Sequence, residues 1–140
     1  MHERLIGTWK LVSATREEIP SGASTDQLGP DPDGYINYAP DGRMIAIIAR
    51  SDRARPARPQ PTPAEAEALC RSMVAYAGRY TIDGDTVPHH VDVSWNESWN
   101  GSKQVRIFRF DGERLQLSTL PSPDPSEGRM SVRRMVWEKV

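Results

Sequence analysis

In the segment PHHVDVSWNESWNGSKQVRIFRF, residues 88–110, a histidine and an arginine occur two positions away from apolar residues in what look like strands. Side chains two positions apart point to the same face of a strand, so His89 shares a face with Val91 and Arg106 shares one with Phe108. An imidazole can transfer protons near neutral pH, and a guanidinium can stabilise an enolate or a carboxylate. The sequence therefore indicates His89 and Arg106 as the residues able to do acid–base or anion-binding chemistry.

Metal and cofactor chemistry is not indicated. His89 and His90 are neighbours in a strand and so point to opposite faces, and no His-x-His or His-Glu-x-x-His spacing occurs. No nucleophile elbow, phosphate-binding glycine loop or dinucleotide fingerprint is present. The single cysteine, Cys70, falls on the apolar stripe of an expected helix, which favours an inert packed thiol. We therefore expect no metal and no cofactor.

Composition excludes several classes of protein. Eighteen basic and nineteen acidic residues give a net charge of −1, which leaves no surplus of Lys and Arg for binding nucleic acid. No apolar run approaches the ~18 residues of a membrane span, and the N-terminus is charged where a signal peptide is apolar. One cysteine rules out an internal disulfide. We expect a single cytoplasmic domain over residues 1–140, with no membrane partner; a homodimer remains open.

The elements that position these side chains are strands. Hydrophobic alternation with a period of two predicts eight strands, at 7–15, 35–39, 43–50, 76–82, 86–95, 103–110, 114–120 and 129–140. Asp-Gly pairs at 83–84 and 111–112 predict tight hairpins in which both central residues need positive φ. Consecutive antiparallel strands favour a closed up-and-down β-barrel, since closure removes exposed sheet edges, and a two-sheet sandwich is the alternative.

One helix interrupts the strands. Thr62-Pro63-Ala64-Glu65 has the pattern of a capping box and predicts a helix near 63–75, lying across an opening or a side of the barrel. Its apolar stripe would consist of Ala66, Leu69, Cys70, Met73 and Val74. The segment before it, residues 50–63, holds four arginines and four prolines. A solvated, proline-stiffened loop is favoured there over a basic docking site.

Five motifs in order cover nearly the whole chain: LIGTWKLVSA, GYINYAPDGRMIA, YAGRYTIDGDTVPHHVDVSWNESWNGSKQVR, LQLST and MVWEKV. With these motifs the chain resembles the bacterial and fungal lipocalin-like domain family, over roughly residues 5–139. The resemblance implies an all-β fold, a single eight-stranded antiparallel up-and-down barrel with one short helix. It implies much less about activity, because fold does not fix function. Some lipocalin-like barrels act as cyclases or isomerases, so the resemblance also keeps an enzyme open.

Alternation assigns an inward face to each strand. The residues expected to face in are Trp9, Leu11, Ser13, Ile36, Tyr38, Met44, Ala46, Ile48, Tyr76, Gly78, Tyr80, Ile82, His89, Val91, Val93, Gln104, Arg106, Phe108, Leu115, Leu117, Thr119, Arg133, Met135 and Trp137. An interior of this kind, broad apolar walls with a few polar groups, is how small-molecule sites are built. The expected ligand-binding residues are Trp9, Tyr38, Tyr80, His89, Gln104, Arg106, Phe108 and Trp137.

Three functions remain open on the sequence. The leading hypothesis is a barrel that binds a small apolar or aromatic molecule carrying a polar or acidic group. The second is a cofactor-free isomerase or cyclase in the same pocket, with His89 as acid/base and Arg106 stabilising an enolate or carboxylate. The third is a structural or partner-binding barrel with a filled interior, in which Arg106 and Gln104 belong to an internal hydrogen-bond network.

Overall fold

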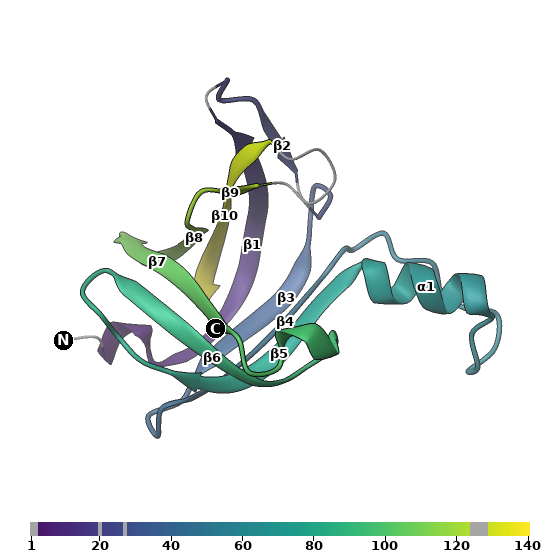
Figure 1. The fold of residues 1–140 in the computed structure, drawn as a ribbon, viewed down its shortest axis with the longest axis horizontal. Helices are drawn as coiled ribbons and strands as arrows, with labels where there is room; N and C mark the ends of the chain where they lie inside the picture. Colours follow the sequence, from purple (N-terminus) through teal and green to yellow (C-terminus); the bar gives the residue numbers. More distant parts are fainter. Residues whose placement is uncertain (1–2, 20, 27, 124–128) are drawn as a thin grey trace.

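The computed structural model describes residues 3–19, 21–26, 28–123 and 129–140 and is dominated by strands (Figure 1). Two short 3-10 helices, η1 and η2, and one α-helix, α1, accompany them. The elements in chain order are η1 (Glu3–Leu5), β1 (Gly7–Glu18), β2 (Ser24–Asp26), β3 (Asp33–Tyr38), β4 (Arg43–Ala49), α1 (Pro63–Arg71), β5 (Met73–Tyr80), β6 (Thr86–Ser94), η2 (Glu97–Trp99), β7 (Lys103–Asp111), β8 (Arg114–Thr119), β9 (Ser122–Pro123) and β10 (Met130–Lys139).

Eight strands of the described chain form a closed antiparallel barrel. They lie in the order β1-β3-β4-β5-β6-β7-β8-β10, and β10 pairs back with β1 to close the sheet. The short strands β2 and β9 extend β1 and β10 at one end. Each predicted strand overlaps one strand of this barrel, so the predicted eight-stranded barrel is confirmed and the sandwich alternative is wrong. Among the described helices, none is long and apolar enough to cross a membrane.

The barrel interior is a core of large apolar and aromatic side chains. Trp9, Tyr38 and Trp137 are all buried in it. At one end η1 closes the barrel: Leu5 is fully buried, and its carbonyl oxygen accepts the indole N–H of Trp9 at 2.9 Å. Buried side chains such as Leu5 and Trp9 therefore fill the barrel at this end.

Two β-bulges overturn part of the predicted inward face. In β1 the register shifts between Leu11 and Ser13, so that Ala14, and not Ser13, is buried. In β6 the register shifts between the partners of Ala77 and Gly78, and Val93 lies 57 % exposed on the outer wall. The extra residue of a bulge reverses the alternation beyond it, because the side-chain period of a strand is two.

Glycines take the positions where the backbone is most constrained. In the hairpins after Asp83 and Asp111, Gly84 and Gly112 have positive φ, whereas no described non-glycine residue does. The prediction that both central residues have positive φ is thus wrong; a glycine alone in the first central position is the pattern of a type II′ turn. Opposite the β6 bulge, a Cβ on Gly78 of β5 would lie 1.9 Å from the His90 carbonyl oxygen. Only a glycine lets β5 and β6 approach this closely.

The predicted helix is present but shorter, and it does not cover the barrel. Its capping box is confirmed: Thr62 Oγ1 accepts the Glu65 N–H at 3.2 Å, and Glu65 Oε1 accepts the Thr62 N–H at 2.8 Å. The helix ends at Arg71, and Met73 already belongs to β5, because pairing with β4 captures residues that also suit a helix. No residue of α1 is buried, and Figure 1 shows α1 projecting away from the strands. Cys70 is exposed, so the packed thiol is a wrong prediction.

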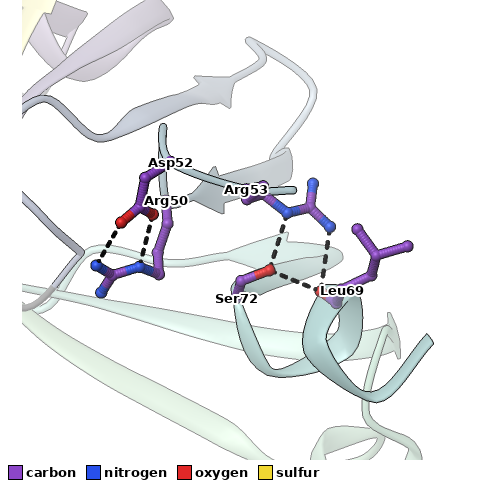
Figure 2. Close-up of polar contacts among 5 residues, drawn as sticks. All are labelled: Arg50, Asp52, Arg53, Leu69 and Ser72. Atoms are coloured by element: carbon purple, nitrogen blue, oxygen red, sulfur yellow. Dashed lines mark hydrogen bonds and ion pairs between the residues drawn. The ribbon is translucent and has the colours of Figure 1, made fainter. Parts of the chain in front are cut away.

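The arginine-rich segment ties itself to the end of this helix. Arg53 donates from Nε to Ser72 Oγ at 2.9 Å and from Nη2 to the Leu69 carbonyl at 3.1 Å (Figure 2). A cation at the C-terminal carbonyls stabilises a helix against its own dipole. Arg50 pairs with Asp52 beside it, through two hydrogen bonds of 2.9 Å. Arg53 thus connects the loop to the end of α1, and Arg50 forms an ion pair within the loop, so both arginines have structural partners.

Candidate functional site

A cavity lies inside the barrel, toward the end opposite η1. Its volume is about 60 Å³. Apolar and aromatic side chains make most of its wall: Leu28, Ile36, Ala46, Ile48, Val74, Trp99, Leu117, Met135 and Trp137. Five polar or partly polar side chains complete it: Tyr76, His89, Arg106, Thr119 and Arg133. Strands β3 to β8 and β10 therefore all contribute to one cavity, together with Leu28 from the connection between β2 and β3 and Trp99 from η2.

A buried hydrogen-bonded relay of three side chains forms one wall. The Tyr38 hydroxyl lies 2.6 Å from Nε2 of His89, and the Tyr76 hydroxyl lies 2.7 Å from its Nδ1. His89 and Tyr38 are almost completely buried, and Tyr76 nearly so. The sequence places these side chains together because Tyr76 and Tyr38 face inward from β5 and β3 and His89 faces inward from β6. Both ring nitrogens of His89 are thereby occupied.

Burial determines how these groups titrate. Removal from water lowers the pKa of His89 to about 3, and the nearby charges of Arg106 and His90 act in the same direction. Burial raises the pKa of Tyr38 well above its ordinary value, and it raises the pKa of Tyr76 as well, against an opposing effect of Arg106. At neutral pH the relay is therefore an uncharged imidazole between two uncharged phenols.

Arg106 brings a positive charge to the cavity wall. Its side chain is half-buried and donates from Nη1 to the Val105 carbonyl oxygen at 3.1 Å. It also lies near enough to the Tyr76 hydroxyl to lower the pKa of that group. Within the described chain no carboxylate pairs with it. A guanidinium has five N–H donors, so the bond to the Val105 carbonyl, even with the nearby Tyr76 hydroxyl, leaves donors available.

One buried donor on the cavity wall has no partner. Trp137 is 1 % exposed, and its indole Nε1–H has no hydrogen-bond acceptor among the described residues. More than nine in ten buried polar groups in proteins are paired, so an orphan of this kind needs an explanation. Trp137 is also one of the residues that line the cavity.

The eight predicted ligand-binding residues divide into three groups. His89, Arg106 and Trp137 line the cavity. Tyr38 lies behind it and reaches it through His89. The other four lie elsewhere: Trp9 packs near η1, Tyr80 donates to the Ala39 carbonyl at 2.7 Å, Gln104 donates to Ser102 Oγ at 2.9 Å, and Phe108 packs edge-on to Phe110.

Sequence reasoning also left out residues that the cavity contains. Tyr76, Thr119 and Arg133 were expected to face inward, and their strand phase was the signal that could have selected them. Trp99 and Leu28 lie in η2 and in the connection between β2 and β3, where no periodic pattern assigns a side-chain direction. Loop residues at a barrel end can be assigned only once the strands are in place.

The surroundings of His89 do not support its candidate role as a catalytic acid/base. A general base near neutral pH needs a pKa near 7 and a ring nitrogen within reach of the substrate. His89 has a pKa of about 3, and both of its ring nitrogens are bonded to tyrosine hydroxyls. The described residues also contain no group of three or more His, Cys, Asp or Glu side chains that could hold a metal ion.

A family model and one solved structure support the same fold. A family model described as a lipocalin-like domain matches residues 6–140. The chain is similar to the structure of a lipocalin-like protein from Bacteroides uniformis, with 15 % identity, a TM-score of 0.51, and coverage of 98 % of this chain and 99 % of that one. An uncharacterized protein from Bacteroides eggerthii has 13 % identity, a TM-score of 0.46, and coverage of 97 % and 99 %. No curated protein matches the sequence.

Proposed function

This chain belongs to the lipocalin-like domain family, and we propose that it binds a small apolar or aromatic molecule with a polar or acidic group inside the barrel. The observation that carries the proposal is the half-buried Arg106 on the wall of a mainly apolar cavity. Broad apolar walls supply affinity, and a few convergent polar groups supply orientation. The fold alone would not be sufficient, because one fold serves many functions.

The charge of Arg106 supports a ligand with an acceptor group. Partial burial of a cation costs free energy unless acceptors compensate it, and the acceptor that Arg106 has in the described chain, the Val105 carbonyl, is neutral. A ligand carbonyl, phenol or carboxylate on the remaining donors would offset this cost. A charge-assisted hydrogen bond of this kind contributes roughly 1.5–3 kcal/mol.

The size of the cavity limits the ligand. A cavity of about 150 Å³ holds a benzene ring, whereas this one is about 60 Å³. The polar head of a ligand therefore fits inside. An aromatic ring of the ligand would fit only if half-buried residues of the cavity wall, such as Leu28, Val74 and Trp99, moved outward.

The test compares two arginines of the same strand. Arg106→Leu removes the charge from the cavity, while Arg109→Leu removes an exposed charge from the outer face of β7. We expect Arg106→Leu to weaken binding of the best aromatic acid in a panel roughly ten- to a hundredfold, with the protein still folded, and Arg109→Leu to bind as wild type. Affinity is measured by isothermal titration calorimetry and folding by circular dichroism.

The same variants separate the proposal from the filled structural barrel. If Arg106 serves only an internal network, Arg106→Leu lowers the melting temperature by several degrees and no member of the panel binds the wild type. Mass spectrometry of small molecules extracted from the purified protein gives an independent readout. Ligand binding would be contradicted if the extracts held no apolar compound in stoichiometric amount and no aromatic acid of the panel bound the protein.

A further inference from the structure

Three residues that line the cavity carry hydrogens to donate: Trp137, Arg106 and Thr119. Trp137 contributes an indole N–H without an acceptor in the described chain, and Arg106 contributes a guanidinium. Thr119 Oγ1 accepts the backbone N–H of Arg133 at 3.0 Å, so its own hydroxyl hydrogen remains to be donated. Among the described residues that line the cavity there is no aspartate or glutamate.

The protonation of His89 makes Tyr76 a further donor. Within the described chain, His89 Nε2 is the partner of the completely buried Tyr38 hydroxyl. If Nε2 carried the hydrogen, the Tyr38 O–H would be a buried donor without an acceptor, which is unfavourable. We therefore assign the hydrogen of His89 to Nδ1: Tyr38 donates to Nε2, and Nδ1–H donates to the Tyr76 oxygen.

Under this assignment the Tyr76 oxygen accepts from His89 Nδ1 and lies near the positive charge of Arg106. Its own hydrogen then has neither of them as an acceptor and is available to whatever lies in the cavity. The buried, neutral His89 keeps this arrangement at all pH values well above 3. The relay thus orients a hydroxyl and does not transfer protons.

We infer that the cavity is a carboxylate-binding site, in which Tyr76 O–H, Trp137 Nε1–H and the Arg106 guanidinium bind the carboxylate of a small aromatic or branched-chain acid. A carboxylate has two oxygens and about four acceptor sites, which match several converging donors, and its charge matches that of Arg106. An amine would present donors to donors and is rejected. The inference rests on the proposed function and deepens it by fixing the chemical class of the ligand.

The test uses three probes of nearly one size: benzoate, the neutral benzamide and the cationic benzylamine. The chain has four tryptophans, so the ¹⁵N-labelled protein gives four indole N–H signals, and Trp137→Phe identifies that of Trp137. We expect benzoate to move the Trp137 signal, benzamide to bind at least tenfold more weakly, and benzylamine to leave the signal in place.

Variants then locate the donors. Tyr76→Phe and Trp137→Phe each remove one donor and keep the ring, and we expect each to weaken benzoate binding roughly tenfold. Tyr80→Phe and Trp95→Phe are the matched controls, because Tyr80 bonds the Ala39 carbonyl and Trp95 lies outside the cavity. If Trp137→Phe does not fold, the benzoate-induced shift of an indole N–H signal in the wild type and the benzoate affinity of Tyr76→Phe still test the inference.

Three results overturn the inference: benzoate binding that leaves the Trp137 signal unmoved, benzamide or benzylamine binding as tightly as benzoate, or unchanged benzoate affinity in Tyr76→Phe. If a neutral probe moves the Trp137 signal and benzoate does not, the carboxylate inference fails while the proposed function survives. If none of the three probes moves this signal up to its solubility limit, the carboxylate inference fails, and the proposed function fails with it when the wider panel and the extracts also show no ligand.

Discussion

Acid should destabilise this protein through His89. In the unfolded chain a histidine binds a proton as the pH falls through about 6.5, whereas native His89 stays neutral down to a pKa of about 3. The unfolded state therefore takes up more protons between these values. The contribution of His89 to the free energy of unfolding is fully present above pH 6.5. It is lost progressively as the pH falls toward 3, by about 1.4 kcal/mol per pH unit.

The magnitude at one accessible pH is substantial. Between pH 7.0 and pH 4.5 this linkage removes about 3 kcal/mol, a large share of the ~5–15 kcal/mol that stabilises a typical domain. Carboxylates also titrate over part of this range, so the wild-type loss alone is not specific to His89. His89→Gln removes the imidazole and leaves the carboxylates, and the difference between the two proteins isolates the histidine.

Urea unfolding followed by tryptophan fluorescence at both pH values provides the measurement. We expect His89→Gln to be less stable at pH 7.0, because it leaves a buried tyrosine hydroxyl unpaired, yet to lose about 3 kcal/mol less than wild type on going to pH 4.5. His90→Gln removes the neighbouring histidine, which is not fully buried, and should keep the wild-type loss. Equal losses in wild type and His89→Gln would refute the buried Tyr38–His89–Tyr76 relay.

Two further predictions concern the rest of the fold. Gly78→Ala should destabilise the protein by at least about 3 kcal/mol, because its Cβ would lie 1.9 Å from the His90 carbonyl oxygen; a urea titration that matches that of Ala77→Ser would contradict this. Cys70 should react with a thiol reagent at the rate of a small free thiol in native buffer, since it is exposed on α1; a reaction that requires denaturant would show that the helix packs against a surface in solution.

Strand phase was readable from the sequence because a strand has a side-chain period of two. That period predicted the eight barrel strands and the inward direction of His89, Arg106 and Trp137, and the capping box located the start of α1. The motifs were sufficient to identify the lipocalin-like resemblance. These features are local, or repeat along one element, and so each can be read from a short window of residues.

The tertiary structure decided everything that depends on the register between strands. The β6 bulge turns Val93 outward, although Val93 is as apolar as the inward-facing Val91. Pairing of β5 with β4 ends α1 at Arg71. Tyr38, separated by 51 positions from His89, meets it only because β3 and β6 face each other across the closed barrel. The orphan indole N–H of Trp137 is likewise a property of its surroundings. A hydrogen bond requires two groups to lie close in space, whereas alternation along the chain determines only which face of a strand a side chain points to.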